Sequence, residues 1–434
     1  MKGKTKRFSR AEWSWIFYDW ANSVYATNVM AAIFPILYNK IADPTGSQLY
    51  GYAVSLANLA VAALAPLLGS IADFRGMKKK LWFGFMLIGA VFTGLMGLVG
   101  SWQLMLVGLV ISRIGFSGSC LFYDSFLTDV TTVDRMDKVS TWGYAMGYIG
   151  GSTIPFLISI AIMLVMDMNE LSMRLAVLIV PVWWLVFSVP FMKHVHQISY
   201  VDTPRKELIS SAWKNVWVTA RQIIKNKAVF FFLAAYFFYI DGVDTIISMA
   251  TNYGDTLGLG TIGMVLALLV TQIVAMPCSI LFGNWSRKLG ALKLITAAVM
   301  MYAFITVVGF AMGFTVDFHD MLGLTAETAL TIGNVLFWIL ATLVGTVQGG
   351  IQALSRSYFG QIIPAERSGE YYGFMDIFGK FACVIGPALY ELVYVLTQKA
   401  SFGILSLILL FVLGGVFLLI GKPYFKAVEH ERVG

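Results

Sequence analysis

Two stretches of the sequence share one pattern, and they decide the fold: Gly69-Ser-Ile-Ala-Asp73-Phe-Arg-Gly76-Met-Lys-Lys79 and Gly283-Asn-Trp-Ser-Arg287-Lys-Leu-Gly290-Ala-Leu-Lys293. Each stretch follows a long apolar run and carries Gly, Gly and Lys at the same spacing. Two further matches lie outside them: Asp134-Arg135 corresponds to Glu366-Arg367, and Asp19 with Asn22 corresponds to Asp241 with Asp244. These internal repeats predict a chain built from two related halves.

The composition indicates that water is not the main solvent of this protein. Of the 434 residues, 58% are hydrophobic and only 13% are charged, whereas a soluble domain carries about 25% charged residues. The mean hydropathy is +0.75. Apolar runs of about 18 or more residues recur along the whole chain, and each can cross a bilayer core of about 30 Å.

Twelve such runs are separated by charged residues or by Gly, Pro and Asn. Only helices suit them, because a spanning segment must satisfy its own backbone hydrogen bonds in lipid. The sequence therefore predicts an all-α integral membrane protein. The expected spans are 13–39, 49–72, 80–99, 103–127, 140–165, 172–192, 228–250, 258–284, 291–313, 329–355, 370–396 and 401–421.

The basic residues predict the orientation of the chain in the membrane. Of the 31 Lys and Arg, 26 fall on the side of the N-terminus, three fall on the other side and two fall inside spans. Cytoplasmic loops are the ones enriched in Lys and Arg, so we expect both termini in the cytoplasm.

The net charge of +7 is spread over short clusters between spans, which argues against binding of nucleic acid. No cleaved signal peptide is expected, because the first span already contains Asp19.

The longest polar stretch divides the spans evenly. We therefore expect an N-terminal six-helix bundle at 1–192, a cytoplasmic linker at 193–227 and a C-terminal six-helix bundle at 228–434. Trp213 and Trp217 stand among Lys and Arg in the linker, which favours an amphipathic helix on the inner membrane surface. A partly ordered loop is the alternative. Two parallel six-helix halves are typical of secondary transporters with a site at the midplane.

Several motifs resemble a known family of transporters. Gly69-x-x-x-Asp73-x-x-Gly76-x-Lys78-Lys79 resembles the signature loop of the major facilitator superfamily. Tyr18-Asp-Trp-Ala-Asn-Ser23, Asp241-Gly-Val243 and Val347-Gln-Gly-Gly-Ile-Gln-Ala-Leu-Ser-Arg-Ser357 are similar to the vacuolar-effluxer-like family. That family comprises fungal vacuolar amino-acid exporters linked to autophagy and many bacterial relatives. The resemblance runs from about residue 12 to residue 395.

This resemblance implies the fold, the location and one set of functional residues. It implies twelve helices in two pseudo-symmetric six-helix bundles, the major facilitator fold, and a place in a bacterial inner membrane. It implies a cytoplasmic latch between the halves formed by Asp73, Arg75 and Lys79. It also implies export of amino acids or similar small solutes. Span four departs from the family, because Asp124 stands where the family has Asn.

Charged side chains within spans usually face a cavity or a partner, because they are costly in lipid. Asp19 and Asn22 lie one turn apart on one face of span one, where they are candidates to bind a substrate ammonium or a coupling cation. A structural bond between helices is the alternative.

Asp241 and Asp244 share a face of span seven and disfavour each other's ionisation, which suits reversible protonation. An ion pair with Arg113 is the alternative here.

Uncharged side chains next to these acids complete the predicted substrate path. Two of them are Gln348 and Gln352, for which the alternative is a hydrogen bond that ties two helices together. The predicted substrate contacts are Asp19, Asn22, Tyr18, Tyr123, Tyr239, Gln348 and Gln352, and the predicted coupling residues are Asp241, Asp244 and Asp19. Asp376 and Lys380 are four residues apart in span eleven and are read as a structural pair.

A second gating element is predicted from the repeats. Asp124 lies ten residues before Asp134, and Arg356 lies ten residues before Glu366. The two residues therefore occupy matching places in the two halves with opposite charges, and we expect them to pair when the carrier closes on the cytoplasmic side.

The sequence contains no catalytic motif and predicts no enzyme. It has no H-E-x-x-H, no G-x-S-x-G and no Walker loop, so no cofactor and no metal are expected. The leading hypothesis is an alternating-access exporter or exchanger of an amino acid or similar small polar solute, coupled to protons and acting as a monomer. The alternatives are a glycoside–cation symporter and a non-transporting membrane sensor or lipid-handling protein.

Overall fold

The computed structural model describes residues 7–202 and 208–433. Side chains at 208–210, 261, 262, 265, 382, 383 and 430–433 are outside the description. Within these residues the chain is helical, with one isolated bridge between Phe74 and Val201. It forms two compact units: Met1–Thr219 with Ile363–Ile377, and Ala220–Ile362 with Phe378–Gly434. The N-terminal part of α15 (Ser368–Thr397) thus belongs to the first unit.

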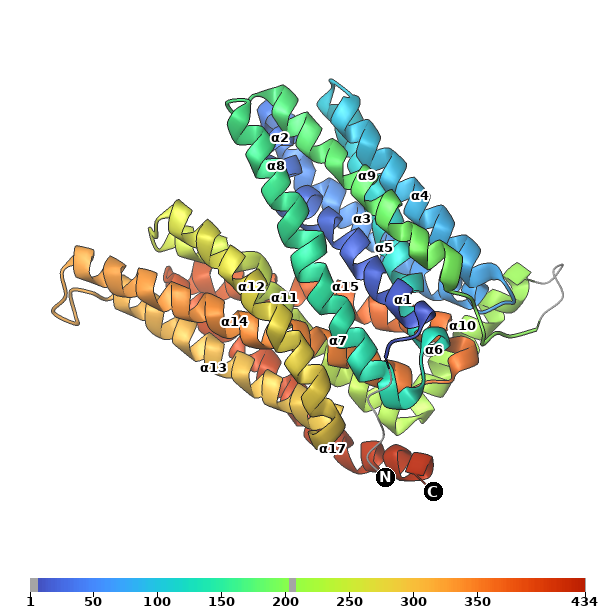
Figure 1. Ribbon diagram of the computed structural model, residues 1–434. Helices are drawn as coiled ribbons and strands as arrows, with labels where there is room; N and C mark the ends of the chain where they lie inside the picture. The colour runs from blue at the N-terminus through green and yellow to red at the C-terminus, as the bar shows by residue number, and fades with distance from the viewer. Residues whose placement is uncertain (1–6, 203–207, 434) are drawn as a thin grey trace. The chain divides into compact units, whose positions relative to one another are not determined.

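Unit 1 begins with a broken helix and continues with long helices (Figure 1). Here α4 packs against α5 and α9, α1 packs against α9, and α3 packs against α5. The elements are α1 (Arg10–Val24), the π-helix η1 (Tyr25–Ala31), α2 (Ile33–Ile41), α3 (Pro44–Ala72), α4 (Met77–Leu98), α5 (Trp102–Ser125), α6 (Leu127–Val130), the 3₁₀ turn η2 (Val133–Arg135), α7 (Met136–Met146), the π-helix η3 (Gly147–Thr153), α8 (Ile154–Val165), α9 (Glu170–His194) and most of α10 (Leu208–Lys225).

Unit 2 is built around pairs of long helices. In it α14 packs against α12 and α13, and α11 packs against α17. Its elements are α11 (Lys227–Thr256), α12 (Thr261–Leu289), α13 (Ala291–Asp317), α14 (Ala326–Ile362), the C-terminal part of α15 (Ser368–Thr397), α16 (Ala400–Ser406) and α17 (Ile408–Val433). A 3₁₀ turn, η5 (Ala365–Arg367), precedes α15 in unit 1.

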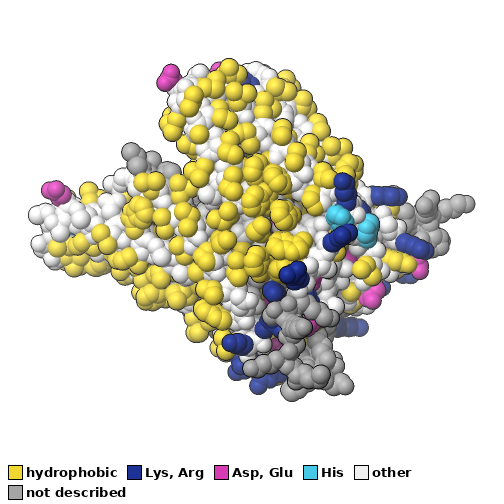
Figure 2. All heavy atoms as spheres, in the orientation of Figure 1, with side chains coloured by type: hydrophobic (Ala, Val, Ile, Leu, Met, Phe, Trp, Pro, Cys, Tyr) yellow, Lys and Arg dark blue, Asp and Glu magenta, His cyan; other side chains and the backbone are white. Residues whose placement is uncertain are grey.

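Eleven helical stretches of the described chain are long and apolar enough to cross a membrane. The expected span 13–39 is absent from this set, and the structure divides it into α1, η1 and α2. The backbone leaves the helical region at Ala32 (φ −127°, ψ −76°). Apolar side chains cover much of the face shown in Figure 2. Leu87, Val91 and Leu95 of α4 are exposed, as expected for residues that face lipid.

Both copies of the repeat have a glycine with positive φ directly before a helix, although ψ differs, at 7° for Gly76 and 141° for Gly290. Gly76 precedes α4 with φ +74°, and Gly290 precedes α13 with φ +88°. Only glycine adopts such angles without a steric penalty, which explains why both copies of the motif keep it. Likewise Arg135 and Arg367 each end a 3₁₀ turn directly before an α-helix, α7 and α15 respectively.

Candidate functional site

Asp73 caps the N-terminus of α15 within unit 1. Its Oδ1 accepts the Gly369 N–H at 2.7 Å, and its Oδ2 accepts the Glu370 N–H at 2.9 Å. These amides have no partner inside the helix, and the N-terminal end of a helix attracts negative charge. Burial raises the pKa of Asp73 to about 7, although Lys78 and both amides favour the ionised form. The predicted role of Asp73 in a cytoplasmic latch stays a prediction.

Small residues bring α3 and α15 into direct backbone contact around this cap. A Cβ atom at Gly69 would collide with the carbonyl of Gly369, and one at Gly373 would lie 2.6 Å from the carbonyl oxygen of Ala65. Small residues permit such close approach of helices in membranes. The glycine of the signature loop therefore serves the contact that Asp73 completes.

A buried ion pair lies beside this cap. Lys78 Nζ is 2.9 Å from Asp129 Oδ2, and both side chains are fully buried. Lys78 also donates to Ser368 Oγ at 2.8 Å. Asp129 Oδ1 accepts the N–H groups of Ile198 and Ser199 at 2.9 and 2.8 Å. The pair thus connects α4, α6, the start of α15 and the first residues of the predicted linker.

The predicted latch residues Arg75 and Lys79 lie at the edge of this cluster. The Arg75 guanidinium lies 5.2 Å from the centre of the Tyr200 ring, and Lys79 Nζ lies 3.5 Å from His196 Nδ1. Sequence reasoning missed Lys78 as the buried lysine. The sequence does indicate this burial, because Lys78 lies on the same helix face as Trp82 and Met86, at four-residue spacing.

Asp19 lies in the interior of unit 1. Its Oδ2 accepts a hydrogen bond from Tyr123 Oη at 2.7 Å. Tyr123 stacks on Trp15 with 4.4 Å between ring centroids, and the Tyr18 hydroxyl accepts from Trp184 Nε1 at 3.2 Å. Both tyrosines are buried in this aromatic cluster. Their contact with a substrate stays a prediction.

A π-helical segment, η3, lies next to the helix that carries Asp19. The π-helix η3 packs against α1, and a Cβ atom at Gly151 would lie 2.5 Å from Ser23 Cβ and 3.0 Å from the Asp19 carbonyl oxygen. Asn22 Nδ2 is buried and has no hydrogen-bond partner among the described residues. π-helical turns occur frequently at functional sites, so this part of unit 1 fits the predicted substrate path.

Asp241 is the most deeply buried acid of unit 2 and is 0% exposed. Its Oδ1 accepts the Gly386 N–H at 2.9 Å and the Thr245 hydroxyl at 3.4 Å. Its Oδ2 is buried without a hydrogen-bond partner in the part of the chain that the structure describes. A carboxylate in this position has one oxygen free to take up a proton or a cation.

The remaining predicted residues occupy several different places. Tyr239 Oη and Ser355 Oγ are 2.6 Å apart in unit 2. Gln348 is 6% exposed and lines a cavity, while Gln352, Asp244 and Asp124 are half-buried.

Arg356 is buried, and its pairing with Asp124 stays a prediction. Arg113 donates from Nε to Asn58 Oδ1 at 3.0 Å, a partner that the sequence did not suggest.

The fold defines the class of protein. Similar solved structures include the human organic anion transporter MFSD10 (TM-score 0.66, 15% identity, 94% of this chain and 99% of that one). An outward-facing bacterial homologue of the iron transporter ferroportin aligns with TM-score 0.67 and 14% identity over 95% of this chain and 98% of that one. The proton:xylose symporter XylE aligns with TM-score 0.65 and 13% identity over 94% of both chains. The fold is that of major facilitator transporters.

Sequence comparison identifies the family. The profile described as "Vacuole effluxer Atg22 like" matches residues 48–131 and 128–422, and the chain belongs to this family. The MFS-type transporter YxiO of Bacillus subtilis is 41% identical over 427 residues, 95% of each chain. Autophagy-related protein 22-1 of Penicillium rubens is 28% identical over 271 residues, 58% of this chain and 43% of that protein. The protein is an integral multi-pass membrane transporter of the MFS type, and these relatives are not enzymes.

Proposed function

We propose that the protein is an alternating-access carrier that exports or exchanges an amino acid or a similar small polar solute, coupled to protons through Asp241. The observation that carries the proposal is the carboxylate of Asp241, which is 0% exposed with one oxygen unpartnered among the described residues. An ionised carboxylate within a membrane span costs about 2.5–3.5 kcal/mol on insertion scales. Reversible protonation removes that cost, and it would link the charge of the carrier to the proton gradient.

The name of the family supports export as the direction of transport. The family description contains the word effluxer, and the fungal relatives are named for autophagy. Asp19, bonded to Tyr123 in the interior of unit 1, supplies a negative group that suits a substrate ammonium. Asn22 adds a buried amide donor with no partner in the described chain, which suits a substrate carboxylate.

Counterflow in proteoliposomes tests transport directly. Vesicles that contain the purified protein and an excess of unlabelled neutral amino acid should transiently accumulate the same radiolabelled amino acid. Empty vesicles and vesicles with the double variant Asp19→Asn/Asn22→Leu serve as controls. Failure of counterflow with a full set of amino acids would refute the amino-acid assignment. Counterflow with a glycoside that also requires sodium would instead establish the glycoside–cation symporter.

The orientation is part of the proposal and has its own test. Because 26 of the 31 Lys and Arg fall on the side of the N-terminus, we propose that both termini and the 193–227 segment face the cytoplasm. Cysteines introduced at positions 210 and 430 should resist a membrane-impermeant maleimide applied to intact cells and should react after lysis. Rapid labelling in intact cells would reverse the topology.

A further inference from the structure

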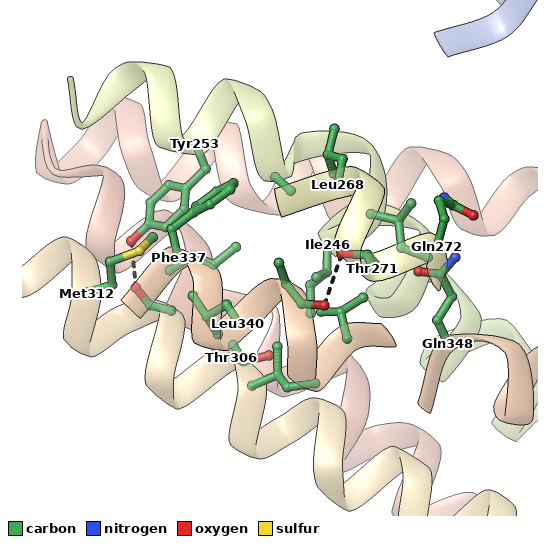
Figure 3. Close-up of a pocket in the computed structure, with 17 residues that line it drawn as sticks. Ile246, Tyr253, Leu268, Thr271, Gln272, Thr306, Met312, Phe337, Leu340 and Gln348 are labelled. Atoms are coloured by element: carbon green, nitrogen blue, oxygen red, sulfur yellow. Dashed lines mark hydrogen bonds between the residues drawn. The ribbon is translucent and has the colours of Figure 1, made fainter. Parts of the chain in front are cut away.

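A cavity in unit 2 is lined by residues of α11, α12, α13 and α14 (Figure 3). Ile404 of α16 also lines it. Its volume is about 90 Å³. An engineered cavity of about 150 Å³ binds benzene, and one water needs about 10–15 Å³. The cavity can therefore hold several waters or a branched group of four to five carbons.

The hydroxyl groups that line the cavity are already engaged as donors. Tyr253 donates to the Gly309 carbonyl at 2.8 Å, and Thr271 donates to the Ala341 carbonyl at 2.9 Å. Thr306 donates to the Tyr302 carbonyl at 2.9 Å. A hydroxyl has a single proton, so these three groups offer a ligand only acceptor capacity.

Two side-chain amides remain available at one end of the cavity. Gln348 is 6% exposed and makes no hydrogen bond within the described chain, and Gln272 Oε1 is buried without a partner among those same residues. Figure 3 shows both amides at the same end of the cavity. Buried polar groups are nearly always hydrogen-bonded, and each unsatisfied one costs about 1–3 kcal/mol. The oxygen of Gln272 is therefore unsatisfied without a ligand or water, and Gln348 lines the same cavity.

The residues lining the cavity also exclude one kind of ligand. They are apolar or uncharged, with no Asp, Glu, Lys or Arg among them. A charged group placed here would lose its hydration and meet no countercharge, which is strongly unfavourable. An amide or hydroxyl group, in contrast, can donate to one glutamine oxygen and accept from the other glutamine's NH₂.

We propose that this cavity is a binding site for an uncharged, mainly apolar group that carries one amide or hydroxyl function, held by Gln272 and Gln348. The group belongs either to the transported solute or to a separate small molecule that binds unit 2 alone. The site does not depend on proton coupling or on the identity of the transported solute.

Binding of two small probes to the full-length purified protein tests the site. The probes are 3-methylbutanamide and 3-methylbutylammonium, which share a branched carbon chain and differ in charge. Saturation-transfer NMR, with empty detergent micelles as background, should detect binding of the amide and not of the ammonium ion. Equal binding of the two probes, or no binding of the amide, would overturn the proposal.

Near-isosteric variants locate the bound probe. Gln348→Met and Gln272→Met should each weaken binding of 3-methylbutanamide about tenfold, as expected for loss of one hydrogen bond. Gln103→Met, at an exposed position of α5, is the matched control and should bind as the parent protein does. Unchanged affinity in both cavity variants would refute the site. Folding of each variant is verified by its melting curve, and the two-probe comparison on the parent protein needs no variant.

Counterflow then identifies the source of the bound group. If saturating 3-methylbutanamide raises the KM for the transported amino acid, the cavity holds part of that solute. If transport is unchanged while the amide binds, the site serves a separate uncharged molecule. Loss of counterflow in the parent protein would refute the proposed transport function and leave the binding result standing.

Discussion

Asp241 in α11 accepts the backbone N–H of Gly386 in α15, with 2.9 Å between Oδ1 and the amide nitrogen. The next residue is Pro387, which lies inside the helix, lacks an N–H and permits a bend. The candidate proton carrier is thus bonded to the backbone of a second helix one residue before a proline. Protonation of the carboxyl would weaken this bond, because a neutral acid is a poorer acceptor than a carboxylate.

The space around Gly386 gives the first prediction. A Cβ atom there would lie 2.7 Å from Asp241 Oδ1 and would overlap Thr245 Oγ1. Gly386→Ala should therefore destabilise the protein by about 1–3 kcal/mol, the usual effect of overpacking. Gly415→Ala in α17, where nothing lies within 4 Å of the added atom, is the matched control. Thermal unfolding followed by intrinsic fluorescence should separate the two variants, and equal melting temperatures would argue against the tight contact.

The buried ion pair gives the second prediction. Lys78→Met leaves the carboxylate of Asp129 buried without its cation, which should cost about 3–5 kcal/mol. Lys78→Met/Asp129→Asn should be more stable than Lys78→Met alone, because the amide oxygen still accepts the linker N–H groups without a buried charge. Lys80→Met, at an exposed position of the same helix, should change the melting temperature little. A double variant no more stable than the single one would contradict the pairing.

The pKa of Asp73 gives the third prediction. Burial raises this pKa to about 7, above the value of about 3.9 for an unfolded chain. The favourable contribution of Asp73 to folding is therefore complete below pH 4 and is lost as the pH rises through 7. Asp73→Asn, which stays neutral, should show a smaller fall in melting temperature between pH 5 and pH 8.

The control for this pH dependence is an exposed acid. Asp202→Asn should follow the pH profile of the parent protein. Parallel profiles for the parent protein and Asp73→Asn would show that Asp73 does not titrate in this range.

The sequence predicted the membrane helices well because each one is a long apolar run. Eleven helical stretches of the described chain are long and apolar enough to cross a membrane. The sequence ended span ten at 355, whereas α14 continues to Ile362. Charged residues such as Arg356 mark the edge of the apolar core, but a helix continues beyond it where water or protein satisfies its polar groups.

The partners of the buried polar residues were harder to predict. From the sequence, the expected neighbour of Asp241 is Asp244 on its own helix, because residues three apart share a face. Its bond to Gly386 joins residues 145 positions apart, and no periodicity indicates such a pair. Gln272 was missed for the same reason, since its relation to Gln348 arises only when α12 packs on α14.

Proton-driven accumulation by the Asp241→Asn variant tests the central claim most directly. The change is nearly isosteric and fixes the neutral form of the side chain. Proteoliposomes with the parent protein and an imposed pH gradient should accumulate the radiolabelled solute above equilibrium, and a protonophore should abolish this. Asp241→Asn should retain solute–solute exchange and lose the accumulation. Undiminished gradient-driven accumulation in Asp241→Asn would contradict proton coupling through Asp241, and the same result in Asp19→Asn would remove these acids from coupling altogether.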